Sequence, residues 1–180
     1  VGFFALLSLV TYLVQRSGKL THVITAAHYQ DLGKLVFAFV VFWAYIAFSQ
    51  YLLIWYANIP EETGWYLRRQ NPQWAAVGLT LLFGHFLVPF VLLLSRGPKR
   101  RPGVLAIVAL WVLVMHWLDI YWLVIPQASP DSASLTLVDI TGLLGVGGLF
   151  VAALVWRMSR QSLVPERDPR LAESLMFENV

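Results

Sequence analysis

Long runs of hydrophobic residues alternate with short polar segments along the whole chain. A helix needs about 20 apolar residues to cross the hydrocarbon core of a bilayer. Four runs have this length, at 32–57, 74–94, 104–125 and 137–158. A shorter run, 1–14, opens the chain, and we expect upstream sequence to complete it as a membrane helix. The pattern predicts an all-α, polytopic transmembrane helical bundle with about five crossings, the first one truncated.

Prolines punctuate this pattern. Pro72 and Pro102 precede apolar runs, whereas Pro126 and Pro165 follow them. These are the positions that proline prefers around helices. Pro89 lies inside the run 74–94 and should bend that helix, because it removes a backbone N–H donor.

Composition supports a chain that is solvated by lipid. Hydrophobic residues make up 58% and charged residues only 13%, against about 25% charged residues in typical soluble domains. The chain has no cysteine, which excludes disulfides, thiol catalysis and the usual ligands of iron–sulfur clusters. The net charge of +3 does not indicate nucleic-acid binding, because the basic residues lie in short segments between apolar runs.

The basic residues predict the orientation of the chain. Residues 15–34, residues 95–103 and the region from Arg157 onward hold three, four and four Lys or Arg residues, eleven in all. The intervening segments 60–71 and 127–136 hold two. Basic loops remain in the cytoplasm. We therefore expect a multi-pass protein of the bacterial inner membrane, with a bundle at 1–163 and a cytoplasmic C-terminal tail at 164–180.

Ionisable residues within apolar runs are candidate functional residues, because burying them in a bilayer is costly. His85 and His116 fall at similar depth on successive antiparallel helices, and Asp119 shares a helix face with His116. An aspartate one turn from a histidine can orient its ring and stabilise its charged form. The three residues are candidates for a proton relay. The structural alternative is a polar clasp between two helices.

Other polar residues extend the candidate proton path towards the outer side. They are Tyr45, Ser49, Gln50 and Asp139. Asp139 also fits an exposed charge at a helix N-terminus, where the helix dipole favours it. On the cytoplasmic side, His28, Asp31 and Lys34 form a second candidate group. The alternative for this group is a solvated cluster at the membrane edge.

A rival interpretation makes His85 and His116 the axial ligands of a haem b, which their matched depth permits. Against it, Asp119 would place a charge near an apolar macrocycle, and the sequence has only one such histidine pair. We therefore predict no metal ligand and no redox cofactor in this chain.

Three stretches of the sequence stand out. The long and specific one, at 24–69, reads ITAAHYQDLGKLVFAFVVFWAYIAFSQYLLIWYANIPEETGWYLRR. Two shorter stretches support it, HWLDIYWLVIP at 116–126 and VPERDPRLAESLMFEN at 164–179. Together they resemble the ActF membrane subunits of alternative complex III, which are similar to NrfD-type proteins. The resemblance covers nearly the whole chain but only the C-terminal half of a usual family member, which has about ten helices in two bundles.

The resemblance implies membership of a respiratory complex that oxidises quinol, menaquinol above all, and passes electrons to cytochrome c or another periplasmic acceptor. Partner subunits would be a homologous NrfD-like subunit, an iron–sulfur subunit and haem c subunits. This chain would anchor the complex and provide a proton path, with quinone or lipid as its possible ligand. Two other functions remain open: a direct quinone-binding subunit, in which His116 and Asp119 take the quinol's proton, and a purely structural scaffold.

Overall fold

The structure is a computed structural model, and it describes residues 1–130, 132–165 and 168–176. These residues form helices and connecting segments without any strand. The chain divides into two compact units, one covering Val1–Ala133 and one beginning at Ser134. Each unit is described by itself. Residues 166–167 and 177–180 of the expected tail lie outside the described residues.

Four helices of the described chain are long and apolar enough to cross a membrane. They are α2 (Ala26–Ala57), the continuous segment Pro72–Leu94, α7 (Pro102–Ala128) and α8 (Leu137–Arg160). A shorter apolar helix, α1 (Gly2–Arg16), precedes them. The expected all-α architecture of a multi-pass membrane protein is confirmed, and each predicted run lies within one of these helices.

Local sequence explains where α2 starts and stops. A capping box opens the helix, because the Thr25 backbone N–H donates to His28 Nδ1 at 3.2 Å. The helix ends at Asn58, whose φ of 50° is left-handed. Pro60 then starts the short helix α3 (Pro60–Leu67), with Glu61 and Glu62 in its first turn, where the helix dipole favours acidic side chains.

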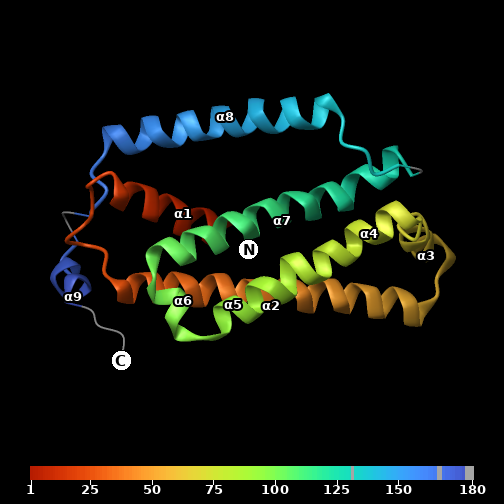
Figure 1. The fold of residues 1–180 in the computed structure, drawn as a ribbon, viewed down its shortest axis with the longest axis horizontal. Coiled ribbons are helices and arrows are strands. Elements are labelled where there is room, and N and C mark those ends of the chain that lie inside the picture. The colour runs from red at the N-terminus through yellow and green to blue at the C-terminus, as the bar shows by residue number, and fades with distance from the viewer. Residues whose placement is uncertain (131, 166–167, 177–180) are drawn as a thin grey trace. The chain divides into compact units, whose positions relative to one another are not determined.

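The segment Pro72–Leu94 consists of three consecutive parts: α4 (Pro72–Thr80), a π-helix η1 (Leu81–Leu87) and α5 (Val88–Leu94). A short helix, α6 (Arg96–Arg100), connects it to α7. In the first unit α1 packs along α7, and α2 packs against both α5 and α6 (Figure 1). The fully buried core includes Val36, Leu93, Leu105 and Val112.

Alternate connections meet at the same end of the first unit. At one end the first turns of α2 lie with α6, since Lys99 packs on Gly33. At the other end α3 and the start of α4 lie with the end of α7, where the Ala133 backbone N–H donates to Gln73 Oε1 at 2.9 Å. This arrangement places the predicted basic segments 15–34 and 95–103 together (Figure 1).

One boundary prediction is wrong. Pro126 was expected to follow its helix, but it lies inside α7, which continues to Ala128. A proline within a helix deprives the carbonyl four residues earlier of its donor. Here that carbonyl belongs to Trp122, and the guanidinium of Arg69 donates to it instead, with an Nε–O distance of 3.2 Å.

The second unit contains α8 and the short helix α9 (Leu171–Leu175). The α8 helix opens with its own capping box: the Thr136 backbone N–H donates to Asp139 Oδ2 at 2.8 Å. Its side chains are exposed or half-buried and largely apolar. Such a surface needs lipid or another apolar surface around it.

Candidate functional site

Three helices bring four polar side chains together in the interior of the first unit. His85 comes from η1, His116 and Asp119 come from α7, and Trp43 comes from α2. The two imidazole rings have centroids 5.9 Å apart, so the two histidines are neighbours across η1 and α7. His116 Nδ1 is 3.9 Å from Asp119 Oδ2. We call these four residues the histidine cluster.

The hydrogen bonding of the histidine cluster is incomplete. Asp119 accepts a hydrogen bond from Trp43 Nε1–H at 2.9 Å. Both nitrogens of His85 and the Nδ1 of His116 are buried and have no hydrogen-bond partner among the residues that the structure describes. His85 is fully buried. Buried polar atoms without partners are rare in folded proteins, so these three nitrogens need a functional or structural explanation.

The position of His85 follows from the π-helix around it. In a π-helix each N–H bonds the carbonyl five residues earlier, and here the Val88 N–H donates to the Phe83 carbonyl. One residue on, Pro89 has no N–H, so the Gly84 carbonyl lacks the corresponding partner. Trp111 of α7 supplies one, with its Nε1–H 2.8 Å from the Gly84 oxygen. Pro89 therefore leaves the Gly84 carbonyl, next to His85, free to accept the hydrogen bond from Trp111. Single-turn π segments occur often at functional sites.

Other side chains and α1 pack against the two rings but leave these nitrogens without hydrogen bonds. The indole ring of Trp43 lies on His85, with centroids 4.2 Å apart. At Gly2, an added Cβ would lie 2.7 Å from His116 Cδ2, so α1 runs directly against this ring. An imidazole can accept a proton on one nitrogen and release one from the other. Two imidazoles beside a carboxylate can therefore pass a proton along the cluster, if a ring turns or a water bridges the gap between them.

The other outer-side candidates are not brought into the histidine cluster. The Tyr45 ring is 63% exposed and stacks on Phe42, with centroids 6.5 Å apart. Gln50 is exposed two turns beyond Trp43 on the same face of α2, and Ser49 is half-buried. Asp139 belongs to the second unit, where it caps α8 through Thr136. These contacts agree with the alternative interpretation of Asp139 as a charge at a helix N-terminus.

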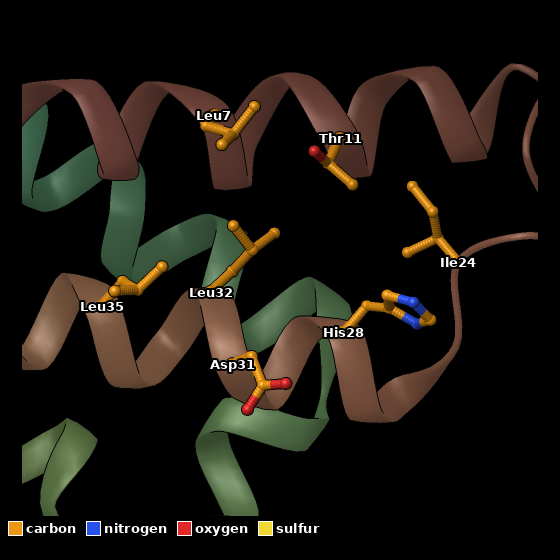
Figure 2. Close-up of a pocket in the computed structure, with 7 residues that line it drawn as sticks. All are labelled: Leu7, Thr11, Ile24, His28, Asp31, Leu32 and Leu35. Carbon is orange, nitrogen blue, oxygen red and sulfur yellow. The ribbon is translucent and has the colours of Figure 1, made fainter. Parts of the chain in front are cut away.

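The cytoplasmic-side candidates lie together on the first turns of α2. Lys34 Nζ donates to Asp31 Oδ1 at 3.0 Å, and both side chains are about half exposed. His28 and Asp31 also line a pocket of about 300 Å³ between α1 and α2 (Figure 2). Its other lining residues are mainly aliphatic and are Leu7, Thr11, Ile24, Leu32 and Leu35. An apolar chain with a polar end fits this lining.

Sequence reasoning missed Trp43, which was one of many aromatic residues in its run. It also missed Arg69, whose guanidinium is buried under α3 and is 3% exposed. Arg69 donates to the carbonyls of Trp65, Trp122 and Leu123 and lies 3.4 Å from the centroid of the Trp65 ring. Burial, followed by the nearby Arg68 charge, lowers the pKa of Arg69 to about 10. The guanidinium therefore remains charged at neutral pH. Pro126 could have pointed to Arg69 in the sequence, because a proline inside a helix leaves the Trp122 carbonyl without a backbone donor and another donor must replace it.

No family model and no curated protein matches this chain. Within the described ranges, no group of three or more His, Asp or Glu residues is arranged to hold a metal ion.

Proposed function

We propose that this chain is a membrane subunit of a quinol-oxidising respiratory complex and that its histidine cluster conducts protons within the bilayer. The first part rests on the resemblance to ActF subunits of alternative complex III. With it come the expected partners: an NrfD-like subunit, an iron–sulfur subunit and haem c subunits in the inner membrane. The second part rests on the geometry of His85, His116 and Asp119.

The observation that carries the proposal is the set of unpartnered nitrogens on His85 and His116. A cluster that served only to hold helices together would be expected to satisfy its buried polar atoms, because each one left unpaired costs about 1–3 kcal/mol. Proton carriers need nitrogens that are available to bind and release protons. The same three atoms are what a relay requires.

In this proposal each residue has a separate role. Asp119 accepts a proton from one side and offers it to His116, whose Nδ1 is 3.9 Å away. His116 passes it to His85 across the ring separation of 5.9 Å. Trp43 orients the carboxylate through its indole N–H and covers one face of His85.

The test is Asp119→Asn, which keeps the shape of the side chain and its acceptor for Trp43 but removes the titratable carboxyl. We expect the complex to assemble, with quinol-driven proton movement per assembled complex about a hundredfold lower, the lower end of what a positioned acid–base group contributes. The matched control is Glu62→Gln, which removes an exposed carboxyl on α3. It should change neither assembly nor proton movement. Unchanged proton movement in Asp119→Asn would refute the relay.

The structural clasp is the second candidate, because the Trp43–Asp119 hydrogen bond joins α2 to α7. It predicts the opposite outcome for Asp119→Asn and for Trp43→Phe: lower yield of assembled complex with normal turnover in the complexes that form. Measuring assembly and turnover in the same preparations separates the two functions.

A further inference from the structure

A buried lysine stands at the end of the bundle where the basic segments meet. Lys99 of α6 is only 8% exposed. Its side chain lies flat on the backbone of α2: a Cβ added at Gly33 would be 2.7 Å from Lys99 Cγ and 3.3 Å from its Cα. The ammonium group lies 5.3 Å from the centroid of the Phe37 ring. The glycine at position 33 therefore allows α6 to approach α2 closely enough to bury this stem.

The Lys99 ammonium has no anionic partner in the part of the chain that the structure describes. It is also absent from the fully enclosed polar atoms, so it reaches the surface at the end of its buried stem. Burial lowers the pKa of Lys99, and the charges of Lys34 and Arg96 lower it further. A cation in this position would gain from a bound anion.

The charged residues of the described chain that act on Lys99 are the basic Lys34 and Arg96. Asp31 is paired with Lys34 at 3.0 Å. Residues 95–103 contain four basic residues and no acidic one. Three of the four, Arg96, Arg100 and Arg101, are exposed.

The surroundings indicate where an anion would come from. α5 ends at Leu94 and α7 begins at Pro102, so α6 lies where two membrane helices leave the hydrocarbon. Leu94 is 62% exposed and offers apolar surface next to the cations. Basic pockets between helices on the cytoplasmic side suit the headgroups of anionic lipids. Free phosphate would use the cations but not the apolar surface.

We infer that Lys99 binds the headgroup phosphate of an anionic phospholipid. The lysine stem stays buried against Gly33 and presents the ammonium to the phosphate oxygens. The acyl chains follow the apolar surface beside Leu94 into the membrane. This site is separate from the histidine cluster and does not depend on the proposed function.

The experiment measures binding of phosphatidylglycerol and phosphatidylcholine to the full chain in detergent by native mass spectrometry. Lys99→Met keeps an apolar stem but removes the charge, and it should weaken phosphatidylglycerol binding about fivefold or more. Arg100→Met removes the same charge from an exposed neighbour and should weaken it less than about twofold, because an exposed charge contributes little. Binding of phosphatidylcholine should be the same in all three proteins.

A second measurement uses the unaltered protein, in case Lys99→Met does not fold. Acetic anhydride labelling in nanodiscs should leave Lys99 protected by phosphatidylglycerol but not by phosphatidylcholine, while Lys19 reacts in both. Equal losses of affinity in Lys99→Met and Arg100→Met would overturn the proposal in favour of general surface attraction. So would displacement of the lipid by inorganic phosphate alone, or equal protection of Lys99 by both lipids.

Discussion

Two prolines interrupt the hydrogen bonding of helices in this bundle, and their surroundings compensate to different degrees. At the end of the bundle formed by α3 and the end of α7, Pro126 removes the donor for the Trp122 carbonyl, and Arg69 replaces it while also bonding Trp65 and Leu123. In the middle, Pro89 removes the donor for the Gly84 carbonyl, and Trp111 replaces it. The backbone is repaired in both places, yet only the middle region leaves side-chain nitrogens unpaired.

Under the proposed function, the region around Arg69 contributes to stability and the histidine cluster to proton conduction. The Arg69 region, which comprises Arg69, Trp65, Trp122 and Trp74, connects its parts by several bonds: Trp122 Nε1 donates to the Trp74 carbonyl, and Trp74 Nε1 donates to that of Ser129. Such a network holds α3, α4 and α7 together. In the proposed relay, the histidine cluster keeps unpaired imidazole nitrogens at a cost in stability, as functional sites commonly do. Mutations in the two regions should therefore have different consequences.

The largest effect on stability is expected for Arg69→Met. The substitution leaves the Trp122 carbonyl buried without a donor and removes the cation from the Trp65 ring, which together should lower the free energy of unfolding by about 2–4 kcal/mol. Turnover per assembled complex should stay normal. Unfolding of the purified chain in mixed micelles gives the first quantity. The control Arg68→Met, at an exposed neighbour, should change stability by less than about 0.5 kcal/mol.

A smaller loss is expected for Trp43→Phe. The phenylalanine ring can still cover His85, but Asp119 loses the indole donor at 2.9 Å. We expect a loss of about 1–2 kcal/mol of stability together with slower proton movement, because the carboxylate is no longer held towards His116. Stability and turnover are measured on the same sample. A loss of stability alone would assign Trp43 and Asp119 to the structural clasp.

The smallest effect is expected for the hydrogen bond from Trp111 to the Gly84 carbonyl, which replaces the one missing at Pro89. Trp111→Phe should cost about 1 kcal/mol when Pro89 is present, because the Gly84 carbonyl then has no donor. In the Pro89→Ala background the new N–H can bond this carbonyl, so Trp111→Phe should cost less. A double-mutant cycle measures this coupling, and about 0.5–1 kcal/mol is expected. Strict additivity would show that Trp111 does not compensate for the proline.

Much of the fold followed from hydrophobic runs, because the length of a membrane crossing is set by the bilayer. The start of α2 was placed six residues late, at 32 where the helix begins at Ala26. Polar residues in its first turns masked a capping box built from Thr25 and His28. The end of α7 was placed early because a proline was taken as a stop, and the compensating guanidinium comes from a distant segment.

Part of the candidate site was also predictable. His116 and Asp119 were predicted to be neighbours because they are three residues apart on one helix. His85 was predicted to lie near them because it falls at a similar depth on the adjacent antiparallel helix. The contribution of Trp43 depends on how α2 is rotated about its axis, and a helix that is apolar on all sides gives no preferred face. For the same reason the sequence could not separate Tyr45, which faces outward, from residues that face the cluster.

The central claim is that Asp119 changes its protonation while the complex works. Infrared difference spectra of the assembled complex, recorded between its oxidised and quinol-reduced states, report this directly through the C=O stretch of a protonated carboxyl. The account predicts a band in the unaltered complex that disappears in Asp119→Asn and persists in Glu62→Gln. A spectrum unchanged by Asp119→Asn would contradict the relay and leave the cluster as a structural contact between α2 and α7.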